Sequence, residues 1–191
     1  MNKKYELTPD IRVFHNRTLH RIKALRDFSD IRKGDIGGYV ESEANLSHEG
    51  RCWIYRTTAN PEEDEWFYSD AMVWGNSQVY ENAKIYEYAR IYDSAKVYGD
   101  TWVSGDIKIF GNAQVSGNVS IHGEAHIYDD ACIAGSCEVY GDARIHGDTQ
   151  IVEINISTKN IKLDHGIWNR IVCVAGNRYL ISTTLQKMLL E

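Results

Sequence analysis

A β-branched residue recurs at every sixth position along the middle of this 191-residue chain. Isoleucine or valine occupies fourteen successive positions at this spacing, without an insertion. The series is Val73, Val79, Ile85, Ile91, Val97, Val103, Ile109, Val115, Ile121, Ile127, Ile133, Val139, Ile145 and Ile151. A spacing of six fits neither the α-helical period nor the heptad of a coiled coil. It is typical of short strands that stack as successive turns of a solenoid.

The residues around each β-branched position predict how one turn is built. In a short strand the middle side chain points inward and its neighbours point outward. The alanine two residues earlier, as at Ala83, Ala89 and Ala95, is expected where the chain turns a corner and space is short. Gly-Asn and Gly-Asp pairs tolerate the positive φ of tight corners. Three hexads per coil predict an all-β fold, a single-stranded parallel β-helix with eighteen residues per coil.

The regions before and between the regular hexads are less periodic. Residues 1–36 are expected to form a small N-terminal β cap, in which "DIRVF" and "TLHRIKAL" flank a turn. Residues 37–154 are expected to form the β-helix, beginning with an irregular coil. An acidic excursion loop at 56–70 interrupts that coil. The loop is interpreted either as a binding loop or lid, or as a tolerated surface insertion.

Residues 155–191 abandon the six-residue period. The segment "RIVCVAGNRYLIS" predicts a C-terminal β-hairpin, and "TTLQKMLLE" predicts a short amphipathic helix. The helix would present an apolar stripe of Leu185, Met188 and Leu189. This segment is expected either to cap the second end of the solenoid or to act as an oligomerisation arm.

Charge is distributed unevenly along the chain. The net charge is −6, yet residues 37–154 carry seven Lys/Arg against twenty Asp/Glu, while both ends are basic. An acidic body lacks the positive footprint that non-specific nucleic-acid binding requires. It could attract a basic partner surface, or it could simply keep the protein soluble.

The cysteines and the hydropathy pattern indicate the cellular compartment that we expect for the protein. Cys52, Cys132, Cys137 and Cys173 form no CxxC pair, so a zinc ribbon is not indicated. No apolar run resembles a signal peptide or reaches the ~20 residues of a membrane span. Free thiols in a bacterial cytoplasm are therefore expected, with no metal, no cofactor and no membrane partner.

The segment from Leu19 to Tyr55, followed by hexads of the "VYGD" type, resembles a module common in phage and prophage genomes. Its hexads are similar to those of left-handed β-helices built from hexapeptide repeats, and this resemblance implies a left-handed coil. It covers roughly residues 5–150. Proteins of this group are often described as hexapeptide-repeat acetyltransferases. That description rests on the repeat itself, and no catalytic motif of the group maps onto this chain.

Residues eighteen apart should be neighbours in adjacent coils, so outward positions can be sorted into columns. The first face carries an aromatic column of Trp74, Tyr92, Phe110, Tyr128 and His146, beside a mostly cationic column, here named the cationic column, of Met72, Arg90, Lys108, His126 and Arg144. Stacking between coils would explain the rings, but aromatic residues and arginine are also enriched at interfaces. We predict a partner or oligomer interface at Trp74, Arg90, Tyr92, Lys108, Phe110, Tyr128, Arg144 and His146.

The other two faces are less uniform. The second face carries Tyr80, Tyr98, Ser116 and Ala134, and its small residues make it a second interface candidate. The third face carries Tyr86, Ser104, His122 and Tyr140 beside Lys84, Trp102, Ser120 and Glu138.

The leading hypothesis is a non-enzymatic interaction protein of the phage or prophage type. It would be a self-associating scaffold, a dimer or trimer, that binds a host protein and blocks a bacterial defence component. The last step rests on analogy with phage accessory proteins. Because the hexads are uninterrupted, no projecting loop builds a pocket among residues 71–151, and this hypothesis assigns no catalytic residue.

Two alternatives remain open. Hexapeptide-repeat acyltransferases resemble this chain in the repeat, and they are typically trimers with a histidine base near a subunit junction. That base would deprotonate a hydroxyl or amine that attacks an acyl-CoA thioester. His122, His126 and His146 are the candidates, although the acidic excursion loop is poorly suited to coenzyme A phosphates. The second alternative is a structural spike or fibre segment of a virion.

Overall fold

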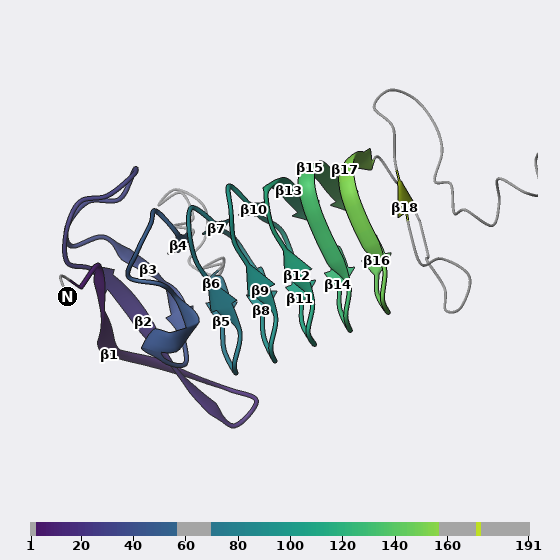
Figure 1. Cartoon of the computed structure of the whole chain (residues 1–191). Coiled ribbons are helices and arrows are strands. Elements are labelled where there is room, and N and C mark those ends of the chain that lie inside the picture. Colours follow the sequence, from purple (N-terminus) through teal and green to yellow (C-terminus); the bar gives the residue numbers. More distant parts are fainter. Residues whose placement is uncertain (1–2, 57–69, 157–170, 173–191) are drawn as a thin grey trace, which may run out of the picture.

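The computed structural model describes residues 3–56, 70–156 and 171–172. Within them, short strands follow one another at intervals of six residues and stack into an elongated prism (Figure 1). The elements are β1 (Tyr5–Phe14), β2 (Arg17–Ala24), β3 (Ile36–Val40), the 3-10 helix η1 (Glu43–Asn45), β4 (Trp53–Ile54), β5 (Met72–Val73), β6 (Gln78–Val79), β7 (Lys84–Ile85), β8 (Arg90–Ile91), β9 (Lys96–Val97), β10 (Trp102–Val103), β11 (Lys108–Ile109), β12 (Gln114–Val115), β13 (Asn118–Gly123), β14 (His126–Ile127), β15 (Cys132–Gly141), β16 (Arg144–Ile145), β17 (Gln150–Ile156) and β18 (Ile171–Val172). The predicted all-β fold is confirmed.

Each regular strand pairs in parallel with the strand one coil further along. Val73 pairs with Ile91, and Ile91 pairs with Ile109, so the register advances by eighteen residues. The first face consists of β3, β5, β8, β11, β14 and β16. The second face contains β6, β9, β12 and the start of β15, and the third contains β4, β7, β10, β13 and the end of β15. The predicted parallel β-helix is confirmed, and the hand of its coil stays a prediction.

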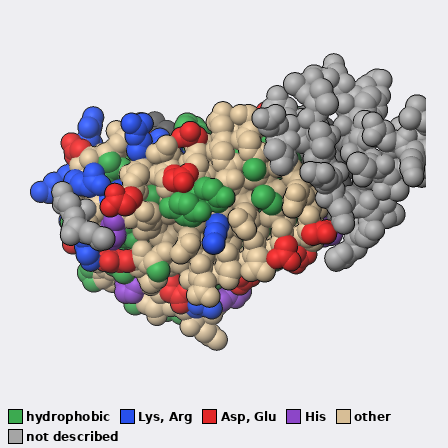
Figure 2. All heavy atoms as spheres, viewed as in Figure 1, with side chains coloured by type: hydrophobic (Ala, Val, Ile, Leu, Met, Phe, Trp, Pro, Cys, Tyr) green, Lys and Arg blue, Asp and Glu red, His purple; other side chains and the backbone are tan. Residues whose placement is uncertain are grey.

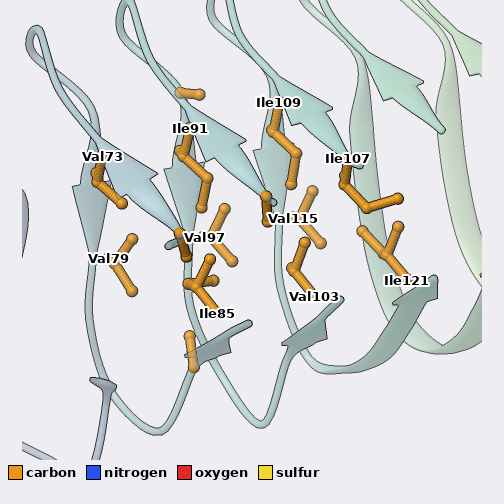
Figure 3. Close-up of a cluster of buried hydrophobic side chains, with 14 of the residues drawn as sticks. Val73, Val79, Ile85, Ile91, Val97, Val103, Ile107, Ile109, Val115 and Ile121 are labelled. Carbon is orange, nitrogen blue, oxygen red and sulfur yellow. The ribbon is translucent and has the colours of Figure 1, made fainter. Parts of the chain in front are cut away.

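The hexad positions form the hydrophobic core. All fourteen β-branched residues from Val73 to Ile151 are at most 2% exposed. Figure 3 shows the side chains of the series from Val73 to Ile121 pointing into the interior from successive coils. Burying a valine or isoleucine side chain contributes roughly 1.5–3 kcal/mol. The preceding coil follows the same rule, since Val40, Leu46 and Ile54 are fully buried.

A second inward position lies two residues before each β-branched residue. Ala83, Ala89 and Ala95 occupy it and are fully buried. Their amides donate to the carbonyl three residues earlier, at 3.3–3.4 Å, which closes the corner. Where Thr101 replaces alanine, its hydroxyl donates to the Tyr98 carbonyl at 2.6 Å, so the buried polar group is satisfied.

The corners hold residues with positive φ, as predicted. The corner after the first face alternates glycine with aspartate in successive coils, and Asp93 and Asp129 both have φ of 59°. Their carboxylates accept hydrogen bonds from the amides of Gly111 (3.2 Å) and Gly147 (3.1 Å) in the next coil. The corner after the second face leaves less space for a side chain. Gly117 in this corner has φ of 92°, and the position that a Cβ atom would occupy is blocked by the Gly135 backbone of the next coil.

A β-hairpin covers the N-terminal end of the prism. β1 and β2 pair antiparallel around His15 and Asn16, which have φ of 47° and 60°, and two positive φ values define a type I′ turn. β2 pairs antiparallel with β3, so the hairpin extends the sheet of the first face. Tyr5 and Ile22 are fully buried and pack against the core around Trp53. The hairpin therefore closes the open end of the core.

A buried arginine fastens this hairpin to the beginning of the regular coils. The Arg21 guanidinium donates to both Asp70 oxygens at 3.0 and 3.1 Å and to Asp10 at 2.6 Å. Arg21 is 8% exposed and Asp70 is 3% exposed, so removing either one would leave the other buried charge with a weaker partner, Asp10 for Arg21 or Arg12 for Asp70. The backbones of Asp70 and Arg56 form an isolated antiparallel β-bridge at the base of the predicted excursion loop.

A second ion pair links the cap to the third face. Asp30 accepts hydrogen bonds from Lys84 Nζ (2.7 Å), from the Tyr55 hydroxyl (2.8 Å) and from the Ser29 hydroxyl (2.9 Å). Burial favours a higher pKa for Asp30, but the hydrogen bonds from Lys84, Tyr55 and Ser29 outweigh it and hold the pKa well below its usual range. This carboxylate therefore stays ionised in the folded protein.

Two predicted segments lie mostly beyond the described part of the chain. Residues 57–69 of the excursion loop fall outside it, as do the C-terminal helix and most of the predicted C-terminal hairpin. β18 falls on the first predicted hairpin strand and pairs in parallel with β17, with Ile171 opposite Ile151. The division into caps and solenoid at residues 36 and 154 stays a prediction.

We expect the tight corner at Gly117 to require glycine. A Cβ there would collide with the Gly135 carbonyl oxygen, whereas a Cβ at Gly147, where φ is 68°, meets nothing within 4 Å. Gly117→Asn should lower the free energy of unfolding by about 1–3 kcal/mol, and the matched variant Gly147→Asn should change it by only a few tenths of a kcal/mol. Urea unfolding measures both. Equal losses in the two variants would contradict the assigned corner geometry.

We expect Asp30 to make stability depend on pH. A carboxyl group with a depressed pKa contributes stability that is present above its unfolded pKa and is lost as the pH falls through the folded pKa. Asp30→Asn should lower the free energy of unfolding by up to about 1 kcal/mol at neutral pH, because the pair is half-exposed. The difference from wild type should shrink as the pH falls below 3.8. In a Lys84→Met background, Asp30→Asn should cost less; an unchanged cost would show that Lys84 does not stabilise this carboxylate.

Candidate functional site

The structure brings together the predicted columns of the first face. Arg90, Lys108, His126 and Arg144 are paired in register on successive strands. Beside them the rings stack almost in parallel, with centroid separations of 4.7 Å for Trp74–Tyr92 and 4.9 Å for Tyr92–Phe110, Phe110–Tyr128 and Tyr128–His146. Stacking between coils is therefore real, whereas a role of these residues as an interface stays a prediction.

The N-terminal hairpin covers the start of the aromatic column. Trp74 is 6% exposed, and the Phe14 ring meets it edge-on at 5.4 Å. The Arg90 guanidinium lies 5.6 Å from the same Phe14 ring. Trp74 belongs to the junction between cap and prism, because the hairpin tip folds back over it. The part of the predicted interface that solvent can reach begins at Tyr92, which is half-buried.

Acidic corner residues accompany the cationic column. Asp106, Glu124 and Asp142 are exposed, and each precedes a member of that column by two residues. Burial lowers the pKa of His126, and the charges of Lys108 and Arg144 lower it further. His126 is therefore neutral at physiological pH, and the first face carries charges of both signs. This arrangement suits a mixed-charge protein surface better than a polyanion.

The second face has its own short ring stack. Tyr80 and Tyr98 lie in parallel with centroids 4.7 Å apart, and Ser116 and Ala134 continue their column.

The space-filling view in Figure 2 shows one side of the prism, on which hydrophobic side chains gather over the middle with Lys/Arg and Asp/Glu side chains around them. Exposed apolar side chains are common on protein surfaces, so this cluster alone does not indicate a binding site.

The third face holds a histidine–carboxylate pair. His122 Nε2 lies 2.9 Å from Glu138 Oε1, and the side chains are 43% and 47% exposed. The imidazole also stacks on Tyr140, with centroids 5.4 Å apart and planes within 4°. The carboxylate fixes one ring nitrogen and Tyr140 fixes the plane of the ring. His122 is thus held in one orientation at a surface that solvent can reach.

This pair has the arrangement of an oriented general base. With an ionised Glu138, the hydrogen bond is donated by His122 Nε2–H, so the proton-accepting lone pair lies on Nδ1. A base oriented by a third group is the arrangement that activates a hydroxyl or amine nucleophile. His126 lies between two cations and His146 lies at the end of the first-face stack, so His122 is the histidine best placed for this chemistry.

Sequence reasoning placed His122 and Glu138 on the third face but missed their pairing. Residues eighteen apart are direct neighbours, and the pair is sixteen apart, so it is a diagonal contact between adjacent coils. A search for opposite charges at this diagonal offset would have found it. Trp102 lies one coil earlier on the same face and is 54% exposed, more than any Tyr or Phe side chain of the described residues.

Other candidate sites are weaker. A shallow hollow of about 560 Å³ lies near the hairpin tip, lined by Arg17, Glu41, Ser42, Gly75, Asn76, Asp93 and Ser94. Its Arg17 and Glu41 already pair with each other at 2.9 Å. Among the described residues no group of three potential ligands could hold a metal ion, and no helix is long and apolar enough to cross a membrane. Leu185, Met188 and Leu189 lie outside the described residues.

No family model matches the chain. A curated protein of Escherichia coli (strain K12), described as the uncharacterized acetyltransferase YdcK, is 32% identical over 82 residues. The match covers 39% of this chain, and the chain spans 23% of the length of that relative. An acetyltransferase-like relative and a parallel β-solenoid together fit a hexapeptide-repeat β-helix.

Proposed function

We propose that this chain is an acyltransferase in which His122 acts as the general base. The observation that carries the proposal is the 2.9 Å hydrogen bond that orients His122 through Glu138 on an exposed face. The similarity to a protein described as an acetyltransferase supports the same reaction class. From the sequence alone, an interaction protein was the leading hypothesis and acyl transfer was an alternative. The oriented histidine favours acyl transfer.

The reaction would be attack of a hydroxyl or amine on an acyl thioester. His122 Nδ1 removes the proton from the acceptor as its oxygen or nitrogen bonds to the thioester carbonyl carbon. The carbon–sulfur bond then breaks, and the departing thiolate takes up a proton from the imidazolium. The ionised Glu138 stabilises the imidazolium between these two steps. The products are the acylated acceptor and a free thiol.

A flat face requires walls from elsewhere to enclose a thioester. Lys84 is the cation of the third face, and it is held by Asp30 at 2.7 Å. The described residues beside His122 therefore do not supply a group of unengaged cations for the phosphates of coenzyme A. We propose that a second copy of the chain, in a dimer or trimer, completes the pocket beside His122, as the resemblance to hexapeptide-repeat enzymes implies.

We expect His122→Asn to retain acetyl-CoA binding and to release free coenzyme A at least about 100-fold more slowly, because the general base is lost. Glu138→Gln should cause a smaller loss, about tenfold, because it keeps a hydrogen-bond acceptor without the charge that stabilises the imidazolium. Calorimetry measures binding, and thiol release in the presence of a panel of sugars, amines and amino acids measures turnover.

His126→Asn is the matched control, since it removes an outward histidine from the first face. It should leave thiol release within about twofold of wild type. If the full-length protein neither binds acetyl-CoA nor releases coenzyme A with any acceptor, the acyltransferase proposal is wrong. Equal losses in the His122 and His126 variants would show that the effect is structural.

A protein-binding scaffold is the second candidate function. The continuous stack of Tyr92, Phe110 and Tyr128 beside Lys108 supports it, because aromatic and basic side chains dominate binding energy at interfaces. On this proposal the chain self-associates and binds a host protein in the bacterial cytoplasm, and it inhibits a defence component. A spike or fibre segment of a virion is a further form of the same proposal. Trimer assembly and presence in purified particles would distinguish that form.

We expect simultaneous replacement of Tyr92, Phe110 and Tyr128 by serine to disrupt such binding. The loss of ring stacking alone should cost roughly 0.2–1 kcal/mol for each pair, so the fold should survive. Light scattering would report the oligomer size, and a pull-down from host lysate would report partner capture. The Tyr80→Ser/Tyr98→Ser variant removes a similar stack from the second face as a control. Unchanged oligomer size and unchanged capture in the triple variant would contradict the scaffold proposal.

A further inference from the structure

A lysine and a cysteine are buried together beneath the N-terminal cap. Lys4 and Cys52 are both 0% exposed, and Lys4 Nζ lies 3.1 Å from Cys52 Sγ. Lys4 belongs to the start of the cap, whereas Cys52 immediately precedes β4 in the first coil. Forty-eight residues of sequence separate them. The contact therefore joins two parts of the chain that only the fold brings together.

Among the described residues no carboxylate forms a hydrogen bond with Lys4, and the charge of Glu49 acts on it only as a minor influence. Its Nζ donates to the backbone carbonyls of Cys52 (2.9 Å) and Glu49 (3.2 Å), and it lies 5.1 Å from the centre of the Phe28 ring. A buried ammonium group is costly unless an anion compensates it. Carbonyl oxygens and an aromatic ring orient the nitrogen, but they supply no full negative charge. Cys52 is the titratable group in direct contact with it.

The surroundings favour the uncharged forms of both groups. Burial lowers the pKa of Lys4, and the contact with Cys52 only partly opposes this. Burial raises the pKa of Cys52, with Lys4 acting in the opposite direction. A neutral amine has a free lone pair, so it is a nucleophile that already touches sulfur.

We propose that Lys4 and Cys52 form a peroxide-dependent covalent cross-link, a sulfenamide between Nζ and Sγ. In the first step hydrogen peroxide oxidises the thiol to a sulfenic acid and is itself reduced to water. In the second step the Lys4 amine attacks sulfur, the S–O bond breaks, and the amine proton and hydroxide leave as a second molecule of water. The product holds an S–N bond, and a thiol reductant restores both side chains.

The cross-link would lock the cap onto the first coil. Next to Lys4, Tyr5 packs against the core, its hydroxyl donates to the Leu46 carbonyl at 2.8 Å, and its ring stacks on His48 at 4.3 Å. These contacts hold the cap reversibly, and local opening of this strand end would admit peroxide to the thiol. A bond from residue 4 to residue 52 would prevent that opening afterwards. The proposal is independent of the acyltransferase proposal, since neither residue lies near His122.

Peptide mapping of the full-length protein tests the cross-link. The protein is treated with hydrogen peroxide in the presence of a metal chelator, then digested after glutamate without reductant. Cleavage at Glu6, Glu49 and Glu62 releases residues 1–6 and 50–62. We expect a linked pair of these peptides, lighter by two hydrogen atoms than the sum of the two, which dithiothreitol separates. Hydrogen exchange of β1 amides should slow at least about tenfold in the oxidised protein.

Matched variants identify the atoms that react. Cys52→Ser and Lys4→Met should abolish the linked pair, whereas Cys132→Ser, which removes a half-buried cysteine of the second face, should leave it unchanged. The wild-type measurement decides the matter even if a Lys4 variant does not fold. The proposal is overturned if peroxide leaves Cys52 as sulfenic or sulfinic acid with Lys4 unmodified, or if Cys52 does not react at all.

Discussion

The eighteen-residue register between coils is the constraint on which the other features of this structure depend. Each strand is only two residues long in most coils, so no strand would be stable alone. Amides such as those of Arg90 and Lys108 donate to carbonyls of the following coil, at 2.8 and 3.0 Å. The same register stacks β-branched side chains inside, glycine or aspartate at the corners and rings outside. A register shift of one residue moves every later side chain to another face unless a local irregularity absorbs it, as between β15 and β17, where Ala134 pairs with Val152 but Cys137 pairs with Ile154.

The repeating part of the fold could be predicted from the sequence because its contacts are periodic. Once the coil length is known, Tyr92 must lie against Phe110, and the structure shows the two rings in parallel. The contacts of the non-repeating cap carry no such period. Trp74 is equivalent to Tyr92 by register, but the approach of the N-terminal hairpin buries Trp74 in a cluster that includes Leu19 of β2 and packs against Phe14. A pattern within the repeat contains no information about that approach.

The two candidate sites also contain contacts that the repeat pattern did not predict, for two different reasons. The pair of His122 and Glu138 follows from the register, but as a diagonal contact, so sorting residues into vertical columns separated them. The contact of Lys4 with Cys52 does not follow from the register at all, because Lys4 precedes the solenoid. In the sequence, Lys4 is one of two adjacent lysines near the N-terminus, and its burial is a property of the cap alone.

Stacking has different consequences for the two candidate functions. In the aromatic column the planes of Tyr92, Phe110 and Tyr128 lie within 4° of one another. Each ring therefore presents its face to a neighbouring coil and only its edge to a partner, so the neighbouring cations would have to supply much of the binding energy. His122 also presents its face to a neighbour, Tyr140, yet its reactive nitrogens lie on the ring edge. A stacked prism thus reduces what an aromatic ring can offer a partner, while it orients a histidine without covering the atoms that exchange protons.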